Sequence, residues 1–317
     1  MQAWTRSAAF LAAMSALASC GGGGGGGGGG GTAVPTTPIA LTSTNAQDAA
    51  GGATLAGLGS ASAGGLFEVA LQSNRALPRT HVLAQIMKRQ IGLLTAQPIS
   101  AAQTTTPCDN SGSTTVTDTG PNSVTIAFNA CSDAAGESLS GTVSVANIVV
   151  NAGVNFSGTA SLGLTLKQTG FPDFGISGTN MNVQETVNGG VDTVTMSGTE
   201  LLATIGATAE RLGNYNLVSV FDNNASTETD TVTFDYASTK IGGQVHVSTI
   251  NSPVTDFASN FPHSGMLSLA GTGGSAIHVI VNSDESGASP QVTIQLDADG
   301  NGAIDTRLDK NWSDLDV

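Results

Sequence analysis

The chain has 317 residues and a formal net charge of −14, with 11% charged and 4% aromatic residues. This acidic balance excludes a general nucleic-acid binder, because such proteins need a basic surface to displace counterions. No apolar run in the sequence reaches the roughly 18–20 residues of a membrane-spanning helix.

Residues 1–19 are predicted to be a cleavable secretory leader. A single Arg6 precedes a short stretch rich in Ala, Leu and Met, which is typical of a leader and too short for an anchor. The stretch ends in Leu17-Ala18-Ser19-Cys20, which resembles the lipobox of bacterial lipoproteins. The alternative is an ordinary secretory leader that is followed by an unmodified cysteine.

The lipobox makes the chain similar to the β-rich outer-membrane lipoproteins of Gram-negative bacteria. This resemblance implies cleavage before Cys20 and lipid attachment to that cysteine. Because residue 21 is Gly and not Asp, it also implies sorting to the outer membrane, facing the periplasm or the cell surface. The resemblance implies no particular activity.

Residues 20–40 are predicted to be a flexible tether between the lipid and a folded domain at 41–317. Gly21–Gly31 is an unbroken run of glycine, which has no preferred fold because glycine loses the most backbone entropy on ordering. The run spans about 18 Å on average and about 38 Å at full stretch. The alternative is a neutral repeat expansion in a tolerant linker.

Two helical segments are expected near the start of the domain. Asn45 is a suitable N-cap for a short helix that starts at residue 46, although the glycines that follow predict low stability. Residues 66–94 carry the clearer helical pattern, divided by Pro78. In its second half the apolar stripe consists of Leu83, Met87, Ile91 and Leu94.

The helical segment at 66–94 also holds a group of basic residues. These are Arg75, Arg79, Lys88 and Arg89. The favoured interpretation is that the helix packs on the domain core and exposes these charges to solvent. The alternative is a surface helix that contacts lipid headgroups.

From Thr114 onward apolar residues alternate with polar ones, and turn sequences separate the alternating runs. The pattern predicts about ten to twelve antiparallel strands with one apolar face. The expected fold is mainly β: a large, curled antiparallel meander, barrel-like or half-barrel-like, with one or two N-terminal helices packed on it. Ser-Gly-Thr recurs at 140–142, 157–159, 177–179 and 197–199, which suggests glycines at a similar height in successive strands.

Cys108 and Cys131 are expected to form a disulfide, because two thiols in an oxidising compartment usually pair. The residues between them read as a β-hairpin with a turn at 120–122, so the bridge would lie across the hairpin's base. A redox or metal-binding pair is the weaker alternative, since the CxxC spacing is absent.

A possible calcium loop follows the predicted strand at 292–296. The sequence from Asp297 to Asp305 fits the pattern D-x-[DN]-x-[DN]-G-x-x-D and resembles strand-flanked calcium-binding hairpins. The resemblance implies side-chain ligands from Asp297, Asp299, Asn301 and Asp305, and a carbonyl ligand from Ala303. Leu308 replaces the Glu of an EF-hand, and the alternative is a polar hairpin turn.

The four histidines, His81, His246, His263 and His278, show no metal-protease or nucleophile-elbow spacing. We therefore expect no enzyme, but a lipid-anchored envelope protein with a structural or binding role and a lipid or envelope-protein partner. The alternatives are a carrier that holds a lipid or other amphiphile in a β-barrel cavity and, more weakly, a hydrolase.

Overall fold

The computed structural model describes most of the predicted domain. The described residues are 33–64, 103–108, 110–120, 122–132, 137–151, 155–169, 173–257, 259, 261–283 and 290–315. Cys20, the leader, most of the tether and the predicted helix at 66–94 lie outside these ranges.

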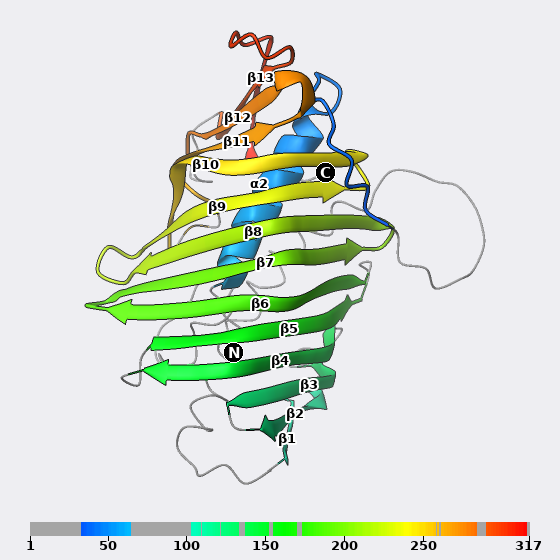
Figure 1. Ribbon diagram of the computed structural model, residues 1–317, viewed down its shortest axis with the longest axis vertical. Coiled ribbons are helices and arrows are strands. Elements are labelled where there is room, and N and C mark those ends of the chain that lie inside the picture. The colour runs from blue at the N-terminus through cyan, green and yellow to red at the C-terminus, as the bar shows by residue number, and fades with distance from the viewer. Residues whose placement is uncertain are drawn as a thin grey trace, which may run out of the picture.

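The predicted β fold is confirmed as one antiparallel sheet in which each strand pairs with the next in chain order (Figure 1). It has fourteen strands rather than ten to twelve, and β1 precedes the expected start at Thr114. The sheet is open, because its described strands end in the two edges β1 and β14, so the barrel alternative is wrong.

The strands are long in the middle of the sheet and shorter at its two ends. They are β1 (Gln103–Pro107), β2 (Ser111–Gly120), β3 (Ser123–Ser132), β4 (Glu137–Asn151), β5 (Asn155–Gln168), β6 (Phe174–Asn188), β7 (Val191–Ile205), β8 (Thr208–Asp222), β9 (Thr227–Ser238), β10 (Gly243–Asp256), β11 (Ser264–Ala270), β12 (Ala276–Val281), β13 (Val292–Asp297) and β14 (Thr306–Lys310).

Four β-bulges interrupt the pairing of β3, β4, β6 and β8. At each of them the bulged strand contains a residue with positive φ: Ala130, Asn147, Asn180 and Asn214. Bulges raise the local twist and bend a strand, which curls a broad sheet. Asn tolerates the left-handed conformation better than most residues, which accounts for three of the four positions.

The Ser-Gly-Thr glycines do not form the row that the repeat suggested. Gly141 pairs with Leu164, Gly158 with Val183, and Gly178 with Leu201. The bulges shift the register between neighbouring strands, so an equal spacing along the chain does not give an equal height in the sheet.

The helix α2 (Ala46–Gly64) lies across one face of the sheet, against β7, β8 and β9 and also β12 and β13 (Figure 1). We call this face the inner face. Asn45 directly precedes the helix, as predicted, but its side chain bonds backward, accepting from the Thr42 N–H at 2.8 Å. The expectation of a short helix was wrong, because α2 spans 19 residues. Its low stability stays a prediction.

Glycines of α2 let it approach the sheet closely. A Cβ at Gly52 would overlap the phenol oxygen of Tyr236, and one at Gly57 would lie 2.9 Å from the ring of Phe234. Both aromatic residues lie on the inner face of β9 and are fully buried. Packing against the sheet, rather than helix propensity, therefore holds this helix.

The N- and C-terminal segments of the described domain join near the start of α2. Pro38 bridges to Gln244 of β10, and the Leu41 N–H donates to Ser275 Oγ at 2.8 Å. At the other end Trp312 is buried, with its ring stacked on Phe261 at a centroid distance of 4.8 Å. The first described contacts of the chain with the sheet thus lie at 37–39, a few residues after the glycine run.

Cys108 and Cys131 form the predicted disulfide, with their Cα atoms 5.5 Å apart. The bridge ties the residue after β1 to β3 at the base of the β2–β3 hairpin, in which β2 ends at Gly120 and β3 begins at Ser123. In the chain-entropy account a loop of this length contributes about 3 kcal/mol. Among the described helices, none has both the length and the apolar character that crossing a membrane requires.

Candidate metal centre

The five residues of the predicted calcium motif lie at the last position of β13 and in the loop that leads from it to β14. The two strands pair in antiparallel register, from Val292 opposite Lys310 to Leu296 opposite Thr306. The flanking-strand arrangement that the sequence indicated is confirmed. Leu308 lies on β14, opposite Ile294, and packs against the core rather than facing the loop.

The loop is held in shape by its own carboxylates. Asp297 accepts hydrogen bonds from the backbone N–H groups of Gly300, at 2.8 Å, and Gly302, at 2.7 Å. Asp305 Oδ2 accepts from the Ala298 N–H at 2.7 Å. Gly300 and Gly302 have φ values of 75° and 85°, a conformation that side chains disfavour. These bonds set the geometry of the loop.

The same contacts act on the pKa of Asp297. Partial desolvation raises it, but the hydrogen bonds from Gly302, Gly300 and Asn301 together outweigh desolvation, so the pKa lies below the ordinary value. The Asp297 carboxylate is therefore ionised throughout the neutral range and can act as a metal ligand.

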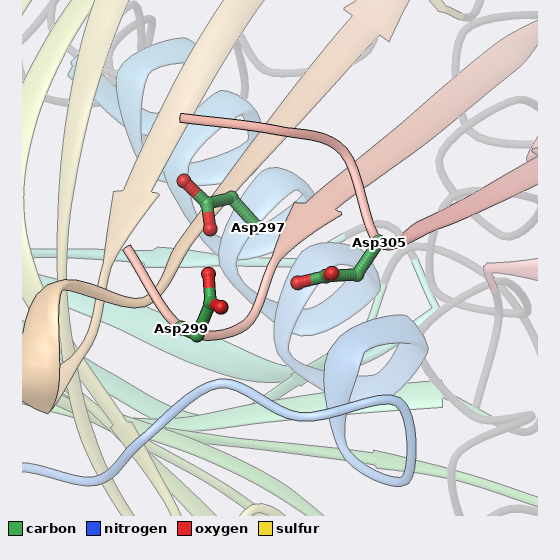
Figure 2. A group of neighbouring side chains, drawn as sticks. All are labelled: Asp297, Asp299 and Asp305. Atoms are coloured by element: carbon green, nitrogen blue, oxygen red, sulfur yellow. The ribbon is translucent and has the colours of Figure 1, made fainter. Parts of the chain in front are cut away.

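Three carboxylates converge in the loop. One oxygen from each of Asp297, Asp299 and Asp305 lies within 4.8 Å of the others, and Figure 2 shows the three side chains gathered in the loop. Hard cations such as Ca²⁺ prefer oxygen ligands of this kind, while Zn²⁺ sites use nitrogen and sulfur. The three residues together therefore fit a divalent cation. A single one of them would be an ordinary surface carboxylate and would not indicate a metal site.

The remaining two predicted ligands lie in the same loop but engage each other. Asn301 Oδ1 accepts from the Ala303 N–H at 2.7 Å, and Asn301 Nδ2 donates to Asp299 at 2.8 Å. The structure thus brings together the three aspartates, while ligation by Asn301 and by the Ala303 carbonyl stays a prediction.

A second acidic group, which we did not predict from the sequence, lies on the inner face of β6, β7 and β9. We call it the inner acidic patch: Glu185, Asp192, Glu228 and Asp230, with exposed fractions of 1%, 5%, 6% and 2%. The strand register places it in two adjacent rows. Glu185, Val194, Ser219 and Asp230 form one row, and Val187, Asp192, Phe221 and Glu228 form the other.

Burial changes the titration of Asp230 in this patch. Desolvation raises the pKa to about 7, and the hydrogen bond from Ser219 Oγ, at 2.6 Å, opposes only part of that rise. Asp192 is held differently: its Oδ2 accepts from Asn223 Nδ2 at 3.3 Å, whereas its Oδ1 is buried without a hydrogen-bond partner.

The histidines are dispersed over the molecule. His246 Nδ1 lies 2.9 Å from Asp235 Oδ1, and His263 Nδ1 lies 3.4 Å from Asp256 Oδ2. His278 lies on β12, opposite Ser268, and His81 is outside the described residues. Each described pair joins a histidine to a carboxylate on a strand or at its end, and these pairs point neither to nor away from catalytic activity.

Comparisons with known proteins identify no relative. No protein-family model, curated protein or solved structure matches this chain.

Proposed function

We propose that this protein is lipid-anchored at the outer membrane through Cys20 and has a non-enzymatic structural or binding role there. The observation that carries the proposal is the order of three segments: the lipobox at 17–20, the glycine run at 21–31, and a folded domain whose first described contacts with the sheet are at 37–39. The Cys108–Cys131 disulfide supports export, because such bonds persist in oxidising compartments.

Replacing the lipid-bearing cysteine tests this proposal. We expect Cys20→Ser to move the protein from the membrane fraction to the soluble fraction, because only acyl chains hold it at the membrane. Ser19→Ala is the matched control and should leave the protein membrane-bound. A Cys20→Ser protein that stays in washed membranes as fully as the unchanged chain would contradict the anchor.

We further propose that the loop from Asp297 to Asp305 binds calcium. The three converging carboxylates and the strand-flanked loop support this, and the surface position favours a weak site of the extracellular type, with a dissociation constant of about 10⁻⁴–10⁻³ M. A bound cation would relieve the repulsion among three carboxylates and tie β13 to β14.

Calorimetric titration of Ca²⁺ into the mature domain measures this directly. We expect saturable heat at millimolar Ca²⁺ and a higher melting temperature, because an ion that binds only the folded state stabilises it. Asp299→Asn should abolish both effects. Asp222→Asn, which alters an aspartate that caps another exposed turn, should change neither. Absence of heat and of a melting shift would exclude the site.

The two alternatives from the sequence, an amphiphile carrier and a hydrolase, stay predictions, but the open sheet excludes the closed barrel in which the carrier's cavity was expected. An amphiphile carrier requires a cavity of roughly 300–1,000 Å³ lined by apolar strand residues. A hydrolase requires a serine hydroxyl within hydrogen-bond reach of a histidine in a cleft. Because neither gains a specific supporting contact, the non-enzymatic anchor is the function we favour.

A further inference from the structure

The edge strand β14 has a neighbouring strand on one side only. The strand order ends at β14, and among the described strands it pairs with β13 alone. The Lys310 carbonyl accepts from the Gln291 N–H at 3.0 Å, on the β13 side. Because bonding alternates along an antiparallel strand, the backbone groups of Leu308 also face β13, while the N–H and C=O groups of Arg307 and Asp309 face away from it. These four outward groups can take a further strand.

The side chains of β14 divide between the two faces of the sheet. Leu308 packs against the core on the inner face. Arg307 and Asp309 lie on the opposite face, with 57% and 45% of their side chains exposed. Arg307 Nε donates to Asp309 Oδ1 at 3.1 Å, and Thr293 Oγ1 donates to the same oxygen at 2.8 Å. Asp309 Oδ2 and the terminal nitrogens of Arg307 can therefore still meet groups of opposite charge.

This edge is complementary to a second copy of itself in antiparallel orientation. Outward backbone groups pair only with outward groups, so within β14 three registers are open. Arg307 opposite Arg307, or Asp309 opposite Asp309, closes two backbone hydrogen bonds and sets like charges side by side. Arg307 opposite Asp309 closes four hydrogen bonds, forms two Arg–Asp pairs and places Leu308 opposite Leu308. The other edge of the sheet, β1, has no charged residue and offers β14 no such match.

We propose that β14 is a self-association surface, through which two copies of the chain pair antiparallel with Arg307 of each opposite Asp309 of the other. The two fourteen-stranded sheets then continue into each other across a two-fold axis. Such pairing covers an edge that would otherwise be a template for uncontrolled strand addition. The interface depends neither on the lipid anchor nor on calcium in the 297–305 loop.

Sedimentation of the full chain in detergent, over a range of protein concentrations, tests this pairing. We expect a monomer–dimer equilibrium. Arg307→Asp should weaken the dimer by about tenfold or more, because symmetry turns two attractive pairs into two repulsive ones. Adding Asp309→Arg to that variant exchanges the two charges and should restore the dimer. Lys167→Asp on β5, which breaks an exposed ion pair with Asp173, is the matched control and should leave the dimer unchanged.

Three results would overturn the proposal. The first is a chain that stays monomeric at every concentration, or an Arg307→Asp chain that dimerises as well as the unchanged one. The second is a charge-exchanged double variant that remains as monomeric as the single reversal. The third is growth beyond the dimer, which would mean head-to-tail pairing of β14 with β1 of another copy.

Cysteine cross-linking checks the register independently. The two Leu308 residues would face each other at a non-hydrogen-bonded position, where Cα atoms are about 4.5 Å apart and within reach of a disulfide. Leu308→Cys should therefore form a covalent dimer on oxidation, and adding Arg307→Asp should reduce its yield several-fold. Ile250→Cys, at an exposed position of β10, is the control and should stay monomeric. A yield at 308 no higher than at 250 would contradict the pairing.

Discussion

Replacing Asp230 with Asn is expected to stabilise the protein at pH 8 by about 4 kcal/mol, the largest effect that we expect from a single substitution. The pKa of this carboxyl is about 7 in the folded protein and 3.8 ordinarily. Between pH 4 and pH 7 the folded state binds the proton on Asp230 more tightly than the unfolded state does. The free energy of unfolding therefore falls as the pH rises through this range. A difference of about three pKa units corresponds to about 4 kcal/mol.

The gain from Asp230→Asn should vanish at pH 4, where the aspartate is protonated in both states. Urea unfolding at pH 4, 6 and 8 measures this trend, and Asn keeps the acceptor for Ser219. Among the described residues, the charged groups on the same face beside Asp230 are Glu185, Asp192 and Glu228. A gain that does not depend on pH would contradict the assigned protonation.

The matched control lies on the same strand, on the opposite face. Burial raises the pKa of Asp235, but hydrogen bonds from His246 and Asn214 lower it more in sum, so this carboxylate is favoured in its ionised form. Asp235→Asn should therefore destabilise the protein by about 1 kcal/mol at neutral pH. In the unchanged protein, the stabilisation that the ionised Asp235 provides should be lost as the pH falls and the carboxylate is protonated.

Gly52→Ala is the second large expected effect, a loss of about 2–4 kcal/mol. The new Cβ would overlap the phenol oxygen of Tyr236, a fully buried residue whose hydroxyl donates to Glu210 Oε1 at 2.8 Å. Overpacking of this kind costs about 1–3 kcal/mol, and displacing the buried hydrogen bond adds to it. Together these two costs exceed the gain of about 1 kcal/mol in helix propensity.

The control substitution is Gly163→Ala on β5, where a Cβ would have nothing within 4 Å. We expect its effect on the free energy of unfolding to stay within about 0.5 kcal/mol. Thermal or urea unfolding measures both variants. If Gly52→Ala raised stability, helix propensity would dominate and the close approach of α2 to the sheet would not hold the domain together.

Much of the sheet follows from local sequence. The alternation at Val232, Phe234 and Tyr236 predicts an inward-facing stripe, and all three residues are buried in β9. The disulfide and the loop at 297–305 were also predictable, because cysteine pairing and the Asp-Gly spacing depend on few residues. These features need only local patterns and simple chemistry.

Other features depend on tertiary contacts that local patterns do not contain. The glycines of α2 predicted a weak helix, but they are the residues that fit against Tyr236 and Phe234. Closure into a barrel depends on how far bulges such as those at Asn147 and Asn180 curl the sheet.

The inner acidic patch could have been predicted from the sequence. Counting back by two from Val232 along the inward phase gives Asp230 and then Glu228, and counting forward from Val183 gives Glu185. Acidic residues at positions whose side chains face inward indicate a polar site inside the fold, because the burial of a charge requires a partner. The alternating pattern was followed only as far as its last apolar residue, so the acidic residues that continue the same face were not predicted to be buried.

Intact-mass spectrometry of the native protein, extracted from membranes in detergent, tests the lipid anchor most directly. We expect the mass of residues 20–317 plus a diacylglyceryl group and, where the amino group is acylated, one further acyl chain. Fragmentation should place the added mass on Cys20. A mass equal to the uncleaved chain, or to a chain cleaved elsewhere without added lipid, would contradict the anchor.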